Sequence, residues 1–419
     1  MKIIRSLNSR ELENICCRRI LRRKRTEKIV RRILDDVRSS GDYALLKYIR
    51  RFDRVEFTPK QLRVTQAEIS GAYQNISPDF VSTLKLVIDN VHRFYKRQIK
   101  KSWRAKSGEG VILGEKVTPL DKVGVYVPAG TAPLVSSVYM TVLPAKIAGV
   151  RRIVLASPAG KNGNINPHIL VVADLLKVRE IYKISGAQAI AALAFGTKTI
   201  PAVDKIVGPG NFYVSEAKRQ AFGWVDIDMV AGPTELVIIA GRRANIDYLV
   251  SDLLAQAEHN FGLAILVTTS KSVAKEVKGR LSGSALDKKR PCGYIVLVKN
   301  LDEAVEVANR IAPEHLQIML KNPRKILSSI DNAGAIFLGD FTPVAVGDYV
   351  AGPSHVLPTT GTARFFSGLS LSAFVKSSHI VSYSRKALEN VRAPLEKLAG
   401  IEGLARHLDS VKVRFASAL

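Results

Sequence analysis

Short apolar runs rich in β-branched residues alternate with stretches of helical periodicity through the middle of the chain. The runs are nearly continuous in apolar residues, as expected for strands of a sheet that helices cover on both faces. This alternation of strands and helices predicts parallel sheets joined by right-handed crossovers. The predicted strands are residues 124–128, 152–158, 180–186, 203–210, 235–241, 264–270, 293–300 and 335–340. The helical segments between them include residues 132–149, 187–195, 246–259 and 302–311.

The strands fall into two groups of four, which predicts an α/β protein with two similar Rossmann-like lobes. No GxGxxG fingerprint follows any strand, so neither lobe carries the usual dinucleotide-binding turn. The chain also lacks a Walker A sequence and a GxSxG nucleophile turn. Residues before about 115 have mainly helical periodicity, and the polar, helical residues after 376 are typical of a terminal arm.

The length of 419 residues allows two or more domains, each with its own core. No apolar run approaches the roughly 18–20 residues that cross a bilayer, and the N-terminus lacks the apolar region of a secretory signal. The three cysteines, Cys16, Cys17 and Cys292, show neither a disulfide framework nor a CxxC metal spacing. These features predict a reduced, cytoplasmic protein without a membrane segment.

The formal net charge of +26 is unusual, and residues 18–32 hold nine Arg or Lys in fifteen positions. Such a run can contact nucleic acid or another polyanion. Its apolar residues, however, recur at helical spacing, and it lacks the interleaved aromatic residues of a base-stacking surface. We therefore interpret the run as the exposed face of a folded helix, with nucleic-acid contact only a non-specific effect of its charge.

Four of the seven histidines stand near other residues that bind metals or exchange protons. Gln256 and His259 are three positions apart in a helical pattern and would share one face of the helix. Histidine, carboxylate and amide groups suit Zn²⁺ without thiolates. Each pair alone is more often a set of ordinary surface or core residues than a functional site. The pairs are Gln256 with His259, Glu314 with His315, Asp348 with His355, and Glu402 with His407.

Glycine-containing turns open the predicted helices in residues 185–197 and 205–218, each at the carboxyl end of a strand. Backbone N–H groups at such a helix start can face an anionic ligand. Ordinary turns between strands and helices have the same composition, so both interpretations stay open.

Six segments have long, distinctive sequences in a fixed order: "GVYVPAGTAPLVSSVYMTVLPAKIAGV", "KIVGPGNFYV", "DMVAGPTE", "DLLAQAEH", "APEHL" and "GDYVAGPSHVLPTTGTARF". They resemble the signature segments of the histidinol dehydrogenase family, and the resemblance extends from about residue 28 to His407. It implies an NAD-dependent, four-electron oxidation of L-histidinol to L-histidine through L-histidinaldehyde, the last steps of histidine biosynthesis. It also implies one Zn²⁺ per subunit and a homodimer with shared active sites.

The resemblance further implies a role for each cluster. Glu314 and His315 correspond to the acid–base pair of the family. The implied zinc ligands are Gln256, His259, Asp348 and His407. The implied substrate contacts are Thr234, Gln256, His259, His315, Asp348, His355, Glu402 and His407, and the implied NAD contacts are Tyr126, Gln188 and Asn211. Thr234 replaces a serine common in the family, and the loop 260–264 after His259 departs from the family's sequence.

From the resemblance we expect residues 26–115 and 236–375 to form a discontinuous zinc-binding catalytic lobe, and residues 116–235 an NAD-binding lobe. Residues 1–25 should form a basic helical segment, and residues 376–419 an arm exchanged in the dimer. The arm would carry Glu402 and His407 to the partner's active site. Zinc has no redox chemistry, so it should anchor the substrate, while neutral His315 takes the hydroxyl proton and Glu314 activates water.

Two alternatives stand beside this prediction. Related zinc- and NAD-dependent dehydrogenases act on other small alcohols, such as sulfonated diols, and should lack the groups that recognise an imidazole and an amine. His355, Glu402 and His407 are all present, which favours histidinol. An inactive relative that binds polyanions through residues 18–32 would instead show salt-sensitive binding and no zinc requirement.

Overall fold

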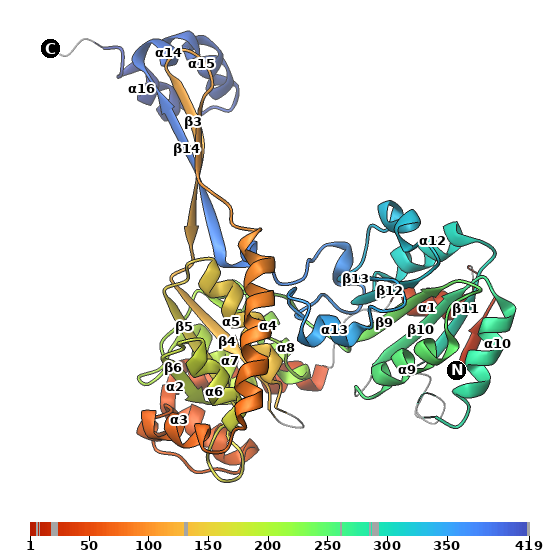
Figure 1. Cartoon of the computed structure of the whole chain (residues 1–419). Helices are drawn as coiled ribbons and strands as arrows, with labels where there is room; N and C mark the ends of the chain where they lie inside the picture. Colours follow the sequence, from red (N-terminus) through yellow and green to blue (C-terminus); the bar gives the residue numbers. More distant parts are fainter. Residues whose placement is uncertain are drawn as a thin grey trace. The chain divides into compact units, whose positions relative to one another are not determined.

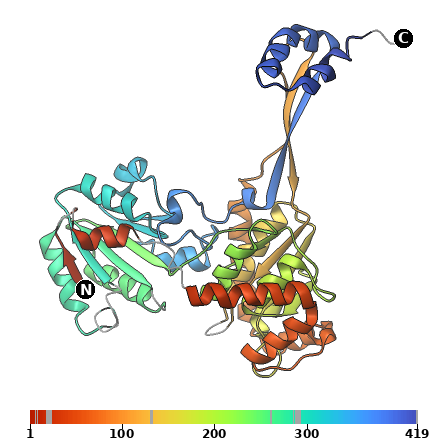
Figure 2. The same ribbon diagram turned by 180° about the vertical axis from the view of Figure 1, so that it is seen from behind.

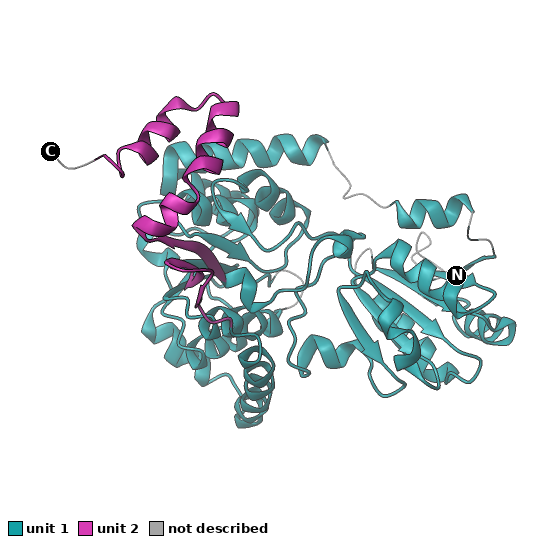
Figure 3. Ribbon diagram, turned by 90° about the horizontal axis from the view of Figure 1, so that it is seen from above, with its two compact units in different colours: residues 1–99, 120–374 teal, residues 100–119, 375–419 magenta. Residues whose placement is uncertain are grey.

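The structure, a computed structural model, describes residues 1–5, 7, 9–17, 24–129, 133–259, 262–284, 286 and 293–416. The chain divides into two compact units, residues 1–99 with 120–374 and residues 100–119 with 375–419 (Figure 3). Much of the basic run 18–32 and the first part of the loop 260–264 lie outside the described residues. No helix in the described part of the chain is long and apolar enough to span a membrane.

The first sheet of the first unit is parallel, with strand order β6-β5-β4-β7-β8. Figure 1 labels β4, β5 and β6 of this sheet. Val123 and Val125 of β4 pack on one face with helices α3 to α6, while Val154 and Ala156 of β5 pack on the other with α2, α7 and α8. Both faces are therefore buried, as the continuous apolar runs predict. The strands are β4 (Lys122–Tyr126), β5 (Arg152–Ser157), β6 (Glu180–Lys183), β7 (Lys205–Val207) and β8 (Asp226–Ile227).

The second sheet is also parallel, with strand order β1-β11-β10-β9-β12-β13. When the strands are numbered from 1 along the chain, starting at β4 in the first sheet and at β9 in the second, both sheets have the order 3-2-1-4-5. Strand β1 adds to the edge of the second sheet beside β11. The shared order confirms two similar Rossmann-like lobes. The strands are β1 (Lys2–Ile4), β9 (Glu235–Ala240), β10 (Leu263–Thr268), β11 (Gly293–Leu297), β12 (His315–Met319) and β13 (Ala335–Leu338).

Helices cover the two faces of the second sheet as they do those of the first. Helices α1 and α12 pack on the face that includes Val237 and Ile239, and α9 and α10 pack on the face of Leu236 and Ile238. The helices of the first unit are α1 (Arg10–Cys16), α2 (Lys24–Phe52), α3 (Gln66–Tyr73), α4 (Pro78–Lys96), α5 (Val135–Ile147), α6 (Pro167–Leu175), α7 (Gly186–Phe195), α8 (Phe212–Ala221), α9 (Ile246–Ala257), α10 (Lys271–Arg280), α12 (Leu301–Ile311) and α13 (Val344–Tyr349).

The expected grouping of residues 26–115 with 236–375 is wrong. The buried side chains of α2 pack with α7 and α8 of the first sheet, and those of α4 pack with α5. Figure 2 shows the ribbon of the same molecule from behind, with α2 in red and orange-red. An amphipathic helix shows which face it buries but not which sheet covers that face, so periodicity alone could not decide. The segment 1–25 is not purely helical either, because β1 pairs in parallel with β11 at the edge of the second sheet.

The second unit joins two distant segments of the chain in an antiparallel sheet of order β14-β3-β2. Strand β14 pairs with β3 over nine residues, from Val375 opposite Pro119 to Tyr383 opposite Val111. The predicted arm therefore also includes residues 100–119. Its elements are β2 (Trp103–Lys106), β3 (Val111–Pro119), β14 (Val375–Tyr383), α14 (Arg385–Asn390), α15 (Arg392–Ile401) and α16 (Ala405–Lys412).

A buried ion pair fixes the turn between β7 and α8. The ammonium of Lys218 contacts the carboxylate of Asp228 and donates to the carbonyl oxygen of Gly208 at 3.0 Å. The Gly208 N–H in turn donates to Asp228 at 2.7 Å. Both charged side chains are at most 3% exposed, so neither charge has water as an alternative partner.

Replacing Lys218 with Met should therefore lower the free energy of unfolding by about 3–5 kcal/mol, because it leaves the Asp228 carboxylate buried and unpaired. Thermal or urea unfolding measures the loss. The double variant K218M/D228N should lose less than K218M, since no charge stays unpaired. Arg50→Met breaks the exposed Arg50–Glu56 pair and is the control, with a change of roughly 0–1 kcal/mol. An equal loss in K218M and R50M would contradict the prediction.

Candidate active site

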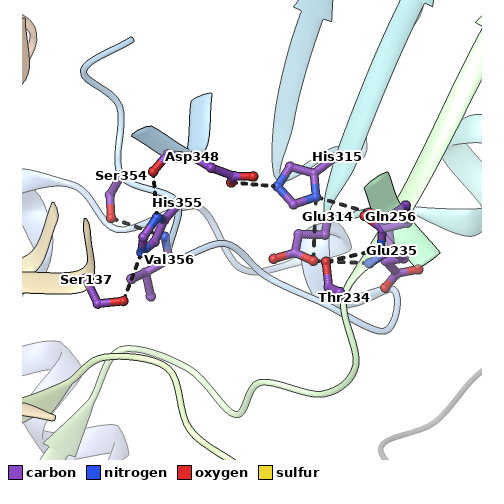
Figure 4. A network of polar contacts seen from close by, with 10 residues as sticks. All are labelled: Ser137, Thr234, Glu235, Gln256, Glu314, His315, Asp348, Ser354, His355 and Val356. Carbon is purple, nitrogen blue, oxygen red and sulfur yellow. Dashed lines mark hydrogen bonds and ion pairs between the residues drawn. The ribbon is translucent and has the colours of Figure 1, made fainter. Parts of the chain in front are cut away.

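The second sheet gathers polar side chains where β9 and β12 begin. The two strands pair in parallel with His315 opposite Leu236, so Glu314–His315 and Thr234–Glu235 meet at one edge of the sheet. Figure 4 shows these side chains together with Gln256, Asp348 and His355. The sequence did not predict β12 as a strand, because His315 and Gln317 interrupt its apolar residues.

His315 has one nitrogen bonded to the backbone and one free. Its Nδ1 lies 3.3 Å from the carbonyl oxygen of Glu235, which can only accept, so Nδ1 carries the proton in the neutral ring. Nε2 is buried without a hydrogen-bond partner and lies 3.8 Å from Oδ1 of Asp348. Burial lowers the pKa of His315, and the charge of Asp348 partly opposes this. The neutral imidazole therefore presents an unprotonated Nε2 at near-neutral pH.

Glu314 is a buried carboxyl group with few compensating contacts. Its Oε2 accepts the N–H of Glu235 at 3.2 Å and lies 3.6 Å from Nδ1 of His315. Burial raises the pKa of Glu314 to about 8, although a hydrogen bond from Thr234 and the backbone of Glu235 lowers it. The nearby carboxylates of Glu235 and Asp348 raise it further. Glu314 therefore retains its proton at neutral pH and loses it in mildly alkaline solution.

His355 links the polar cluster to the first sheet. Its Nδ1 lies 3.0 Å from the carbonyl oxygen of Asp348 and therefore donates to it. Nε2 then accepts a hydrogen bond from the hydroxyl of Ser137, at 3.2 Å. Burial lowers the pKa of His355, so both of these bonds are made by the neutral ring. Ser137 lies in α5, and sequence reasoning missed it; the only signal was a serine pair in an apolar helix.

Gln256 and His259 reach the same edge of the sheet from the end of α9. The helix ends at Ala257, so His259 lies beyond its C-cap instead of within the predicted helix 246–259. The amide nitrogen of Gln256 lies 3.4 Å from the hydroxyl of Thr234, which leaves its oxygen available to another partner. His259 is close enough to Asp348 to lower the pKa of that carboxyl, which burial raises.

The donor types in this cluster fit zinc. Gln256, His259 and Asp348 provide an amide oxygen, an imidazole and a carboxylate, and Zn²⁺ takes nitrogen and oxygen ligands, usually four in number. Only two of these donors, His259 and Asp348, are His, Cys, Asp or Glu, and within the described residues no three side chains of those types form a group that could hold a metal ion. The three implied donors all belong to the first unit, whereas the implied fourth ligand, His407, belongs to the second unit. Glu402 and His407 are both exposed there, at the end of α15 and in α16.

A separate cavity of about 820 Å³ opens at the carboxyl ends of strands in the first sheet. Tyr126, Gln188 and Asn211 all line it, from β4, α7 and the start of α8. The strand order reverses between β4 and β7, which is where α/β sheets bind ligands. A Cβ on Gly208 would overlap the carbonyl oxygen of Tyr126, so only glycine allows the β7 turn to approach β4 this closely. The cavity size suits a dinucleotide.

The sequence profile of the histidinol dehydrogenase family matches residues 17–415. The chain belongs to the histidinol dehydrogenase family. It is 48% identical to the histidinol dehydrogenase of Clostridium acetobutylicum over 398 residues, 93% of this chain and 92% of that protein. The identity to the histidinol dehydrogenase of Caldanaerobacter subterraneus is also 48%, over 405 residues and 94% of each chain.

A solved structure agrees with this assignment. The crystal structure of histidinol dehydrogenase from Elizabethkingia anophelis matches with a TM-score of 0.93 and 34% identity, covering 100% of this chain and 98% of that chain. The histidinol dehydrogenase family comprises NAD-dependent oxidoreductases that act on histidinol in the final oxidation steps of histidine biosynthesis.

The raised pKa of Glu314 predicts a pH-dependent cost to stability in metal-free protein. The pKa is about 8 in the folded chain against an ordinary value of 4.5 for glutamate, so below about pH 4.5 both states are protonated and no cost arises. As the pH rises to about 8, the unfolded state releases a proton that the folded state keeps, and the free energy of unfolding falls. Glu314→Gln keeps the acceptor oxygen and removes this cost.

Melting temperatures measured with a chelator should therefore be higher for E314Q than for the unsubstituted chain at pH 8.5, by roughly 5 °C or more. The difference should shrink towards pH 5. The exposed carboxylate of Glu56 provides the control, E56Q, for which no such trend is expected. A pH-independent difference for E314Q would show that the carboxyl is ionised in the folded chain.

Proposed function

We propose that this chain oxidises L-histidinol to L-histidine through L-histidinaldehyde, using NAD in both steps and one Zn²⁺ per subunit. The observation that carries the proposal is the free Nε2 of His315, buried beside Asp348 and next to the protonated Glu314. A buried acceptor without a partner marks the place where a donor group of the substrate can bind.

His315 is the base of the first step. Its Nδ1–H bond to the backbone fixes the tautomer, so Nε2 accepts the proton of the substrate's hydroxyl as the alcohol becomes an aldehyde. The lowered pKa keeps the ring neutral before the reaction. NAD, when bound, accepts the hydride released in each of the two steps. The nearby carboxylate of Asp348 stabilises the imidazolium that forms.

Glu314 acts on water in the second step. The carboxyl lies beside His315, and once deprotonated it takes a proton from the water that adds to the aldehyde. Its pKa of about 8 makes this base available in mildly alkaline solution. Thr234 and the backbone of Glu235 orient the carboxyl group through hydrogen bonds.

Gln256, His259 and Asp348 would hold the zinc ion, with His407 as the fourth ligand. Zinc, when bound, anchors the polar groups of the substrate and acts as a Lewis acid. His355 and Glu402 would contact the substrate, and Tyr126, Gln188 and Asn211 would contact NAD. We assign Glu402 and His407 to the active site of a partner subunit in a homodimer. The proposed location of the enzyme is the cytoplasm, where thiols stay reduced.

Purified protein should form NADH when L-histidinol and NAD are added, in a 2:1 ratio of NADH to L-histidine. A chelator should abolish the activity and Zn²⁺ should restore it, because without the metal nothing anchors and polarises the polar groups of the substrate. Absorbance of NADH with product analysis measures both. Zinc-loaded protein that forms no NADH from L-histidinol would overturn the proposal, and activity on a sulfonated diol alone would favour another alcohol as substrate.

Complementation between inactive variants tests the shared active site. His315→Ala and His407→Ala remove groups that the proposal places on different subunits of the same site. When the two variants are mixed and allowed to exchange subunits, about a quarter of the wild-type activity should return, since half the dimers are mixed and each has one intact site. No recovery despite verified exchange would mean that each site is built from one chain.

A further inference from the structure

The cavity of the first sheet contains a carboxylate that the proposed reaction does not use. Asp53, directly after α2, is the only acidic residue among the described residues that line it. The hydroxyl of Ser185 lies 2.6 and 2.7 Å from its two oxygens. Burial raises the pKa of Asp53, and the hydrogen bond from Ser185 opposes this.

One hydroxyl cannot satisfy this carboxylate. A carboxylate offers about four acceptor positions, whereas the Ser185 hydroxyl donates a single hydrogen. The remaining acceptor capacity of Asp53 faces a cavity of about 820 Å³. A ribose of a dinucleotide carries two adjacent hydroxyl donors, which match two carboxylate oxygens. Phosphate groups lack such donors and are repelled by the negative charge.

The position of Asp53 indicates which ribose it meets. Leu134 lines the cavity and lies three residues before Ser137, whose hydroxyl contacts His355 of the polar cluster. The nicotinamide must meet the substrate, so it points towards this side of the cavity. Asp53 accepts a hydrogen bond from Ser185, which follows β6. Strand β6 is the edge strand of the sheet and lies two positions from β4. The adenosine half of the dinucleotide is therefore the half near Asp53.

Basic side chains also line the cavity, so the charge of Asp53 bears on whether a 2′-phosphorylated cofactor can bind. Arg32, Lys47 and Arg51 also line it, and only Lys47 has a carboxylate nearby, Asp36 at 4.0 Å, among the ion pairs of the described residues. These cations favour a phosphorylated ligand in general. A phosphate on the 2′ oxygen of the adenosine would, however, face Asp53 directly and also remove the hydroxyl donor.

We propose that Asp53 accepts hydrogen bonds from the adenosine ribose of NAD and excludes the 2′-phosphorylated cofactor. The inference rests on the proposed function, because it takes the cavity to be the NAD site. Asp53 is then the residue that sets the choice of cofactor, in a fold that lacks the GxGxxG turn and the acidic residue that usually follows it.

Calorimetric titration of the zinc-loaded protein with NAD and with 2′-deoxy-NAD, which lacks only the adenosine 2′-hydroxyl, tests the contact. The unsubstituted protein should bind NAD about 10-fold or more tightly than 2′-deoxy-NAD, as expected for a hydrogen bond to a charged group. Equal affinities would overturn the proposal without any variant. Asp53→Ala should bind both cofactors equally, at the weaker affinity.

The comparison of variant and cofactor separates contact from structural support. If Asp53 only stabilises Ser185 and the start of α7, D53A still binds NAD more tightly than 2′-deoxy-NAD. The loss of affinity caused by the substitution and the loss caused by removing the 2′-hydroxyl then multiply. That result would overturn the proposal. Asp53→Asn should also reduce the preference for NAD over NADP by about 10-fold or more, because the 2′-phosphate of NADP then faces an uncharged amide instead of a carboxylate. A preference unchanged in D53N would count equally against it.

Glu56→Gln is the matched control, since it removes a carboxylate three residues away that pairs with Arg50 and does not line the cavity. E56Q should keep both the affinity for NAD and the discrimination of the unsubstituted protein. In kinetics, D53N should raise the KM for NAD and leave kcat within about twofold. Absence of NADH formation by the unsubstituted enzyme would instead count against the proposed function, while the binding comparison would still test Asp53.

Discussion

The parallel pairing of β12 with β9 is the interaction on which the candidate active site depends. It sets His315 opposite Leu236, so the Glu235 backbone can donate to Glu314 and accept from Nδ1 of His315. These two bonds orient the proposed base and acid before any ligand binds. A slip of one residue would turn both side chains to the opposite faces and break both bonds. The proposed catalytic geometry is therefore a property of the sheet register.

Burial then determines the protonation of the cluster. In a low dielectric the charged forms of Glu314, His315 and His355 are all disfavoured, so the acid keeps its proton and both imidazoles lose theirs. These three groups are accordingly uncharged before the site acts, although carboxylates such as Asp348 lie beside them. This limits the cost of burying it and leaves His315 with a free nitrogen. The same environment that costs stability at high pH sets the protonation states that the proposed proton transfer requires.

Much of this architecture could be predicted from the sequence, for identifiable reasons. Strands such as β9 and β10 are continuous apolar runs, and those runs occur where both sheet faces are covered. The packing of α2 on the first sheet was not predictable, because an apolar face does not specify its partner. The sequence grouped Glu314 with His315 by adjacency. It could not reveal Ser137 or Asp53, whose significance comes from contacts with residues more than one hundred positions away.

The two sheets share one strand order, but the cavity and the polar cluster lie at opposite ends of their strands. In the first sheet the cavity lies at the carboxyl ends, beyond Tyr126 and Gly208, as the general rule for α/β folds requires. In the second sheet the polar cluster lies at the amino ends of β9 and β12. Helix α5 begins beside the cavity, and its Ser137 is hydrogen-bonded to His355 of the polar cluster. This contact connects the cavity of the first sheet with the polar cluster of the second. Because the second sheet uses its amino ends, the proposed hydride acceptor and the proposed proton acceptor can serve one substrate from different lobes.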